Sequence, residues 1–321
     1  MSLEVEGLAV TAATAEGPLT LLSDVALTLP VGGALGVVGE SGSGKTLLAL
    51  AIIGLLPDGL AARGTVRLDG VDLLALPEET LCQIRGARIG MIFQEPLSAL
   101  NPAMTVGRQI AEGLRRHKGL DRAAARAEVL RLLDRVHIPG AARRIDSYPH
   151  ELSGGQRQRV GIAIALAPGP DLLIADEPTT ALDVTVQAEI LDLLGELVGE
   201  RGMSLIVISH DLGVIASLSD RVLVMYAGTR VEEGSTKAVL RAPLHPYTKA
   251  LLAAVPRRGA RGGARLATIP GTVPAAGRLP PGCRFAPRCP EAIEACRGRE
   301  PGWDRSPPGR AVRCIGAGPA S

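Results

Sequence analysis

Residues 39–46 read Gly-Glu-Ser-Gly-Ser-Gly-Lys-Thr and fit the pattern G-x-x-x-x-G-K-[ST] of a phosphate-binding loop. The apolar run at 34–38 before the loop predicts a buried strand, and residues 47–56 after it predict a helix. In this order, the backbone N–H groups of the loop and the positive end of the helix face the same anion. The stretch therefore predicts an α/β fold that binds a nucleotide through its phosphates.

The loop carries the groups that a nucleoside triphosphate with Mg²⁺ requires. Lys45 is expected to reach the β- and γ-phosphates, and Thr46 to give its hydroxyl to Mg²⁺. The residues expected to contact the phosphates are Gly39, Ser41, Gly42, Ser43, Gly44, Lys45 and Thr46. A glycine-rich turn before a core helix would not need Lys-Thr at this spacing, so ATP and Mg²⁺ are the expected cofactors.

Two further apolar runs end in polar residues. Asp176 and Glu177 follow the run at 172–175, and His210 follows the run at 205–209. Buried parallel strands bind ligands at their carboxyl ends. Asp176 is therefore expected to hold Mg²⁺ through water, and Glu177 to orient and deprotonate the attacking water. His210 is expected to contact the γ-phosphate.

A third element lies between the loop and these acids, where residues 152–156 read Leu-Ser-Gly-Gly-Gln. Phosphate loops and strand-end acids occur in many ATPases, whereas this string between them resembles the signature of the ATP-binding-cassette (ABC) ATPases. The elements that resemble this family in order and spacing are residues 39–46, Gln94, residues 152–156, Asp176-Glu177, Ala181-Leu182-Asp183 and His210. The resemblance covers about residues 1–250.

This resemblance implies an α/β P-loop cassette with a mostly parallel core sheet, an N-terminal antiparallel β subdomain and a helical subdomain. It also implies that Gln94, which follows the apolar run 89–93, touches Mg²⁺ and couples to a membrane subunit. Asp183 would lie at a dimer seam, and His210 would be the switch histidine. Two cassettes of this family enclose two nucleotides head to tail, so the signature residues would act on the partner's ATP. These residues are Ser153, Gly155 and Gln156.

More specific strings are similar to the ATPase subunits of oligopeptide, dipeptide and nickel importers. They are Gln94–Pro102, Tyr148–Glu151, His245–Leu252 and Gly282–Pro290, which extends the resemblance over nearly the whole chain. The resemblance implies ATP-driven import of a peptide or a similar small solute. The implied partners are a second cassette, identical or paralogous, two transmembrane permease subunits and, through them, an extracytoplasmic binding protein. The chain would then lie on the cytoplasmic face of the membrane.

Two alternative functions belong to other classes. A soluble ABC ATPase acting on DNA or the ribosome usually carries two cassettes or a long insertion between the phosphate loop and the signature. Only about a hundred residues separate Lys45 from Ser153, which leaves room for the helical subdomain alone. A regulatory cassette that binds ATP but hardly cleaves it is disfavoured because Glu177 and His210 are both present.

One feature departs from the family pattern. Related cassettes place an aromatic residue near the end of the first strand to stack on adenine, but residues 10–14 around Ala12 contain no Phe, Tyr or Trp. We therefore expect weak discrimination between ATP and GTP, unless an aromatic from elsewhere, such as Tyr226 or a partner residue, stacks on the base.

Composition divides the chain near Val255. The last 66 residues hold 12 Arg and 4 acidic residues, although the net charge of the whole chain is only +2. They also hold 11 Pro and 11 Gly, which indicates a loop-rich segment. We expect an ATPase domain over residues 1–245, a helical subdomain at about 95–160 within it, and an extension over 246–321. The arginines are spread singly and aromatics are few, so no nucleic-acid partner is expected.

The secondary structure around the motifs follows from periodicity. An antiparallel sheet is expected from Gly7–Thr14, Val25–Leu29 and Thr65–Leu68, and amphipathic helices from Arg122–Leu133 and Ser153–Leu166. No apolar run is long enough to cross a bilayer, and the first residues lack the features of a secretion signal. A cytoplasmic location is therefore expected.

Four of the five cysteines lie in the extension, at Cys283, Cys289, Cys296 and Cys314. Their spacing matches neither zinc pairs nor ferredoxin runs. Structural disulfides are disfavoured in a reducing cytoplasm, and four thiolates are enough to close a metal site. With the resemblance to the peptide-importer tail added, we expect a [4Fe–4S] cluster, with Zn²⁺ and no metal as alternatives. Cys82, alone in a helical stretch, is expected to be buried.

Overall fold

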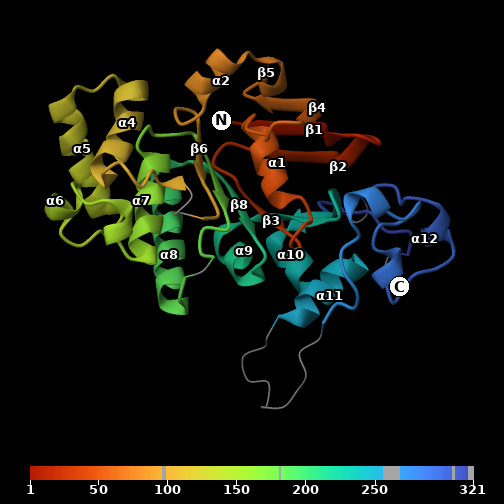
Figure 1. Ribbon diagram of the computed structural model, residues 1–321. Helices are drawn as coiled ribbons and strands as arrows, with labels where there is room; N and C mark the ends of the chain where they lie inside the picture. Colours follow the sequence, from red (N-terminus) through yellow and green to blue (C-terminus); the bar gives the residue numbers. More distant parts are fainter. Residues whose placement is uncertain (96–98, 181, 256–267, 306–307, 317–321) are drawn as a thin grey trace. The chain divides into compact units, whose positions relative to one another are not determined.

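The computed structural model describes residues 1–95, 99–180, 182–255, 268–305 and 308–316 (Figure 1). The chain forms two compact units. The first comprises Met1 and residues 30–33 and 75–208, and the second comprises residues 2–29, 34–74 and 209–321. Each unit is described on its own. Residues 96–98 of the string 94–102, and Ala181 of the string 181–183, lie outside the described residues.

The first unit contains three parallel strands. β7 (Leu172–Asp176) pairs with β6 (Ile89–Ile92) on one side and with β8 (Ser204–Ser209) on the other. Every residue of β7 and β8 is buried. Strands covered on both faces read as continuous apolar runs, which is why the sequence predicted these three strands within one residue of their observed ends.

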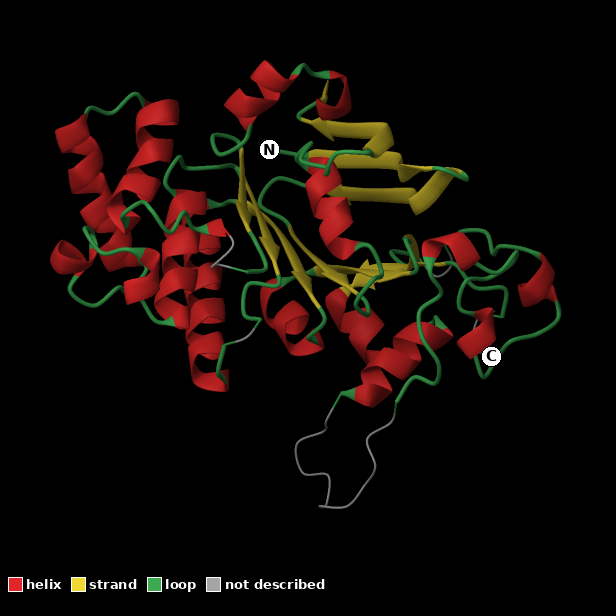
Figure 2. Ribbon diagram, in the orientation of Figure 1, coloured by secondary structure: helices red, strands yellow, loops and turns green. Residues whose placement is uncertain are grey.

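Apart from these strands and the loops, the described residues of the first unit are helical, and Figure 2 shows the helices in red. They are α2 (Glu78–Ile84), α4 (Val106–Lys118), α5 (Arg122–Arg135), α6 (Ala141–Arg144), α7 (Gly154–Leu166) and α8 (Val184–Arg201), with a 3₁₀ turn η2 (Pro149–Glu151) before α7. The helix expected at 122–133 is α5; it begins at its cap Asp121, whose side chain accepts from the Ala124 N–H at 2.8 Å. α4, α5 and α7 pack on one another. The bounds of the helical subdomain, about 95–160, stay a prediction.

The second unit contains the expected antiparallel sheet, with the strand order β2-β1-β4-β5. The strands are β1 (Leu3–Thr14), β2 (Gly17–Leu29), β4 (Leu60–Leu68) and β5 (Val71–Asp72). β1, β2 and β4 are longer than the apolar alternation predicted, because β1 pairs with both neighbours along nearly its full length.

A second set of strands in this unit carries the phosphate loop. β3 (Ala34–Val38) pairs in parallel with β9 (Arg221–Tyr226), which pairs antiparallel with β10 (Thr229–Ser235). β11 (Ala311–Val312) adds to β10. Because β11 comes from the C-terminal extension, this extension supplies the strand at the edge of the sheet, beside β10.

The remaining helical elements of the second unit are short. They are α1 (Lys45–Ile52), α9 (Leu212–Leu218), α10 (Thr236–Arg241), α11 (Pro246–Ala254) and α12 (Ala295–Gly298), with 3₁₀ turns η1 (Leu73–Ala75, ending in the first unit), η3 (Ala276–Arg278) and η4 (Ala286–Arg288). The helix expected at 47–56 ends four residues early, because Gly54 adopts a φ of 65° that breaks the helical repeat. Within the described residues, no helix has both the length and the apolar composition needed to cross a lipid bilayer.

The expectation for Cys82 was wrong. Cys82 lies on α2 and is half-buried, and its thiol contacts Glu78 Oε1 at 3.3 Å. Leu81 is the buried residue of this two-turn helix, so the neighbouring position turns toward solvent.

Candidate functional site

The phosphate loop lies in the second unit, between β3 and α1. Gly44 caps α1 in the left-handed conformation with φ 97°. The ammonium of Lys45 donates to the Gly39 carbonyl at 2.9 Å and to the Glu40 carbonyl at 3.1 Å. A Cβ on Gly39 would lie 2.3 Å from the Met225 carbonyl oxygen, so only glycine fits there. The loop therefore curls around the lysine ammonium, as the sequence pattern requires.

The remaining loop residues differ in exposure. Ser43 is fully buried, and among the described residues its hydroxyl has no hydrogen-bond partner. Ser41, Gly42 and Thr46 are exposed. The exposed residues include Thr46 in the first turn of α1, where its hydroxyl oxygen is of the type that Mg²⁺ prefers. The loop thus combines the buried ammonium of Lys45 with exposed residues, including Thr46, at the positive end of α1.

The catalytic acids predicted from the strand end lie in the first unit. Asp176 ends β7 and is 1% exposed. Glu177 has a φ of 46°, a left-handed conformation that is rare for a residue with a side chain. Its N–H donates to the Ile208 carbonyl at 2.9 Å. This turn re-aims the second acid as the chain leaves the strand, so the two neighbouring carboxylates occupy different surroundings.

Gln94 lies shortly after β6 and Glu177 directly after β7, and the structure brings their side chains together. The Gln94 amide donates to Glu177 Oε2 at 3.0 Å. The same oxygen accepts from the Thr180 hydroxyl at 2.7 Å. Thr180 was not among the predicted site residues; the signal for it was the Thr179-Thr180 pair, which follows Glu177 after one proline. Two donors on one oxygen fix the orientation of the Glu177 carboxylate.

The signature and Asp183 each begin a helix in the first unit. Ser153 caps α7: its hydroxyl accepts from the Gln156 N–H at 3.3 Å, and its own N–H donates to Gln156 Oε1 at 3.1 Å. Asp183 caps α8 by accepting from the Val186 N–H at 3.0 Å. Ser153 and Asp183 are exposed, and Val184 beside Asp183 is 84% exposed. The side chain of Gln156 is thus engaged in the cap.

Gly155 is confined by the same pair of helices. A Cβ at this position would lie 2.7 Å from the Val186 side chain on α8, so α7 and α8 approach closely at their starts. His210 follows β8, is exposed, and lies in the second unit. Lys45 and His210 belong to the second unit, and Asp176 and Glu177 to the first. We predict that these residues act together on one nucleotide.

The metal centre expected in the extension is not seen among the described residues. Among the described residues, which include all four cysteines of the extension, no group of three or more Cys, His, Asp or Glu side chains is arranged to hold a metal ion. The Cys283 N–H donates to the Cys296 carbonyl at 2.7 Å. Burial raises the pKa of Cys283 and of Cys289, and neighbouring cysteines add to this effect. The cysteines lie in one region, but a metal-bound extension is not confirmed.

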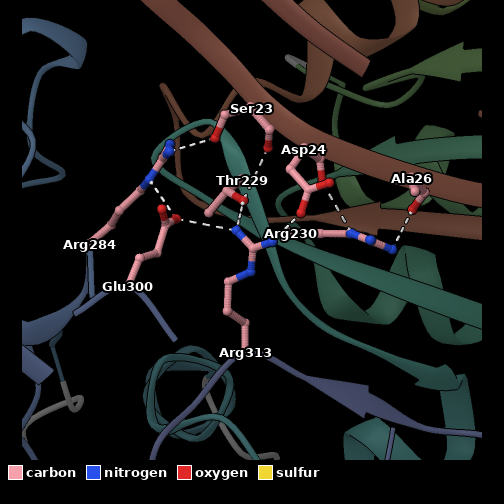
Figure 3. A network of polar contacts seen from close by, with 8 residues as sticks. All are labelled: Ser23, Asp24, Ala26, Thr229, Arg230, Arg284, Glu300 and Arg313. Carbon is pink, nitrogen blue, oxygen red and sulfur yellow. Dashed lines mark hydrogen bonds and ion pairs between the residues drawn. The ribbon is translucent and has the colours of Figure 1, made fainter. Parts of the chain in front are cut away.

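Arginine side chains connect the extension to β2 and β10 (Figure 3). Arg313 donates to Thr229 Oγ1 on β10 at 3.0 Å and pairs with Asp24 on β2. Arg284 donates to the Ser23 hydroxyl at 2.5 Å. On the strand side, Arg230 donates to the Ala26 carbonyl at 3.0 Å and its guanidinium lies 4.4 Å from the centre of the Trp303 ring. These contacts attach the extension to β2 and β10.

Tyr226 cannot stack on a nucleotide base, contrary to one possibility raised above. It is fully buried and packs against Tyr247 at 4.7 Å and Phe285 at 5.2 Å between ring centres. Burial raises its pKa above the usual tyrosine value. Tyr226 therefore does not take the place of the aromatic residue that is missing from residues 10–14 of β1.

Comparison with known proteins agrees with this arrangement. Residues 22–180 match the ABC transporter family, and residues 231–296 match the oligopeptide/dipeptide transporter C-terminal region. A putative peptide import ATP-binding protein of Brucella abortus is 53% identical over 97% of this chain and 94% of its own length. The oligopeptide transport ATP-binding protein OppD of Salmonella typhimurium is 51% identical over 98% and 93%.

Solved structures give the same assignment for the fold. A dimeric ATP-binding cassette in a post-hydrolysis state, bound to ADP and Pi, has a TM-score of 0.65 and 30% identity, covering 73% of this chain and 98% of that one. A second structure, of a dimeric bacterial ABC transporter cassette, has the same TM-score at 29% identity. Since about half of its residues are identical to those of such subunits along nearly the entire chain, the protein belongs to the ATP-hydrolysing subunits of ABC transporters, in the oligopeptide/dipeptide group.

Proposed function

We propose that this ABC ATPase powers the uptake of peptides, or of a similar small solute, across the cytoplasmic membrane. The observation that carries the catalytic part is Glu177, which is turned by its positive φ and fixed by two donors on one carboxylate oxygen. The peptide substrate is supported by the similarity to subunits named for peptide import and oligopeptide transport. A soluble ATPase acting on DNA or the ribosome is not favoured by these relatives.

The proposed roles follow from the chemistry of each group. Lys45 neutralises the β- and γ-phosphates, and the loop N–H groups and the start of α1 bind the same anion. The oxygens of Thr46, Asp176 and Gln94 are suitable ligands for Mg²⁺, which when bound neutralises charge on the phosphate oxygens. Glu177 orients and deprotonates the attacking water. His210 contacts the γ-phosphate.

The proposed assembly is a head-to-tail pair of cassettes, identical or paralogous, on two transmembrane permease subunits served by an extracytoplasmic binding protein. Support comes from the exposed starts of α7 and α8, at Ser153 and Asp183, and from the dimeric cassettes with the same fold. Gly155 and Gln156 belong to the surface that would contact the partner's ATP. The chain would act at the cytoplasmic face as a peripheral subunit.

The four cysteines of the extension are proposed, on chemical rather than geometric grounds, as ligands of a [4Fe–4S] cluster, with Zn²⁺ as the alternative. The support is that four thiols lie in one short region where they influence one another's pKa values. Iron, sulfide and zinc analysis of anaerobically purified protein decides between the two. Protein free of both metals would reject the proposal.

The experiment for the catalytic proposal is Glu177→Gln in the chain assembled with its permease and partner cassette. Turnover is expected to fall by about 10² or more, because water activation is lost while electrostatic stabilisation remains. ATP binding is expected to persist. The matched control is Glu196→Gln, an exposed acid on α8. Turnover of Glu177→Gln within a few-fold of the parent would contradict the role of Glu177, and a lack of peptide-stimulated ATPase activity would contradict the substrate class.

A further inference from the structure

We propose that Arg288 of the C-terminal extension is a positioning residue of the nucleotide site, acting on the phosphate loop through Glu40. The inference rests on the proposed role of that loop in binding ATP. It gives the extension, expected over residues 246–321, a role at the nucleotide site of the ATPase domain.

The contact between the two residues is a paired, parallel ion pair. Arg288 Nη1 donates to Glu40 Oε2 at 2.8 Å, and Nη2 donates to Glu40 Oε1 at 3.0 Å. The Arg288 side chain is only 4% exposed and that of Glu40 28%. Two-point contacts between a planar guanidinium and a carboxylate fix direction as well as distance, which a lysine cannot reproduce.

Glu40 is an integral part of the loop rather than a neighbour of it. Its carbonyl accepts from the Lys45 ammonium at 3.1 Å and from the Ser43 N–H at 3.1 Å, and its N–H donates to the Tyr247 hydroxyl at 2.7 Å. The backbone of Glu40 thus shapes the curl around Lys45, while its side chain is held from outside by Arg288. A change at Arg288 therefore acts directly on the residue that shapes the loop.

Arg288 is itself held in place by the extension. Its Nε donates to the Pro270 carbonyl at 2.8 Å, and Nη1 lies 3.3 Å from the Tyr226 hydroxyl. The aromatic side chains of Tyr226, Tyr247 and Phe285 pack together beneath it. The tyrosine that accepts from the Glu40 N–H is thus in the same cluster as the one that contacts Arg288. The loop and the extension therefore contact the same aromatic cluster.

The ion pair between Arg288 and Glu40 affects nucleotide binding through the negative charge of Glu40. The loop must accept several negative charges from phosphates, and a carboxylate within it opposes them. Arg288 neutralises this carboxylate. Without Arg288, the bare Glu40 charge is expected to repel the phosphates and to pull the loop away from its curled form.

A purely structural role for Arg288, which is to anchor the extension, makes a different prediction. Arg313 anchors the same extension through a nearly buried guanidinium that donates to Thr229 and pairs with Asp24 on β2 and with Glu300, none of which belongs to the phosphate loop. If anchoring alone mattered, Arg288→Gln and Arg313→Gln would weaken ATP binding equally. Arg313→Gln is therefore the matched control.

The test measures equilibrium binding of Mg·ATP, and kcat and KM in the assembled transporter, for Arg288→Gln, Arg288→Lys and Arg313→Gln. Arg288→Gln is expected to weaken ATP binding about tenfold and to raise KM more than it lowers kcat, by analogy with truncated charge pairs. Arg313→Gln is expected to stay within about twofold. Arg288→Lys, which keeps the charge but not the two-point geometry, is expected to fall between them.

A second variant makes the test decisive even if Arg288→Gln is less stable. Glu40→Gln removes the charge that Arg288 neutralises, so adding it to Arg288→Gln is expected to restore most of the lost ATP affinity. No restoration, or equal losses in Arg288→Gln and Arg313→Gln, would overturn the proposal. Lys45→Ala serves as the separate control: if it leaves ATP binding unchanged, the proposed role of the loop fails instead.

Discussion

The phosphate loop and the C-terminal extension are held by contacts of opposite kinds. The loop is closed by Lys45 donating to a carbonyl six residues away and by glycines whose Cβ would clash. The extension is attached by arginines to partners far along the chain: Arg288 and Glu40 are 248 positions apart, and Arg313 and Asp24 are 289 positions apart. A local contact is encoded in one short string, whereas a distant one requires two separate stretches to be correct together.

From this difference we predict which contacts affect nucleotide binding and which affect only the free energy of unfolding. Local steric constraints at the loop act on the geometry of the anion site itself. Distant ion pairs of the extension act on how firmly it is attached to the second unit. The contact between Arg288 and Glu40 is the point where both kinds meet, because a distant arginine ends on a loop residue.

The largest effect is expected from Gly39→Ala, which tests the local constraint. The added Cβ would lie 2.3 Å from the Met225 carbonyl and 2.6 Å from Ser43 Oγ, so the loop must shift. We expect a loss of about 3 kcal/mol in the free energy of unfolding and at least tenfold weaker ATP binding. Urea unfolding and ATP titration measure the two effects. Gly302→Ala in the extension, where no atom lies within 4 Å, is the control and is expected to change neither.

The next largest effect tests a distant constraint. Arg310 on the extension pairs with Glu232 on β10 at 2.6 Å; their side chains are 11% and 0% exposed. Arg310→Gln is expected to lower the free energy of unfolding by about 2 kcal/mol. The loss stays below the 3–5 kcal/mol of an orphaned buried charge because the Leu244 and His245 N–H groups still donate to Glu232.

ATP affinity should change little in Arg310→Gln, in contrast to Gly39→Ala. Arg299→Gln, an exposed arginine of the same extension, is the control for the loss of charge alone. An unchanged urea midpoint for Arg310→Gln would show that the distant ion pairs do not attach the extension.

The free energy of unfolding is expected to depend on pH through His245, at the start of α11. Burial lowers the pKa of His245 to about 3, and its Nδ1 accepts from the Tyr247 N–H at 3.0 Å. Between pH 6.5 and 3 the unfolded chain binds the proton and the folded chain does not, so the free energy of unfolding falls as pH falls. The slope from this one group approaches about 1.4 kcal/mol per pH unit and vanishes above pH 6.5.

Urea unfolding at pH 7, 6 and 5 measures this slope, and His245→Asn removes it. Asparagine keeps a side-chain acceptor for the start of α11 but does not titrate. An equal slope in the parent and in His245→Asn would show that His245 is not the titrating group.

The sequence predicted the local features well and the distant ones poorly. Strand, loop and helix around Lys45, the strand-end position of Asp176, and the cap at Ser153 are all set by residues within a few positions, so patterns reveal them. The hydrogen bond between Gln94 and Glu177 was not predicted, because its donor and acceptor follow two different strands.

The attachment of the extension was not foreseen. Clustered cysteines drew attention to a metal, while the arginines that make the observed contacts looked like dispersed surface charge. Nothing in the string around Arg288 names Glu40 as its partner, because that pairing exists only once both stretches have folded. The early end of α1 at Gly54 is a smaller case, in which a single backbone conformation outweighed a continuous apolar pattern.

The smallest effect concerns the nucleotide base. Residues 10–14 of β1 hold no aromatic, and Tyr226 is buried in the second unit, so we expect ATP and GTP to compete with affinities within about tenfold of each other. Competition against a fluorescent ATP analogue measures the ratio of the two affinities.

Ala12→Tyr should tighten binding of both nucleotides by roughly fivefold, since base–aromatic stacking is worth about 1–3 kcal/mol and every base has a π-face. Ala13→Tyr, on the opposite face of the same strand, should not. A hundredfold preference for ATP in the parent would show that another group reads adenine.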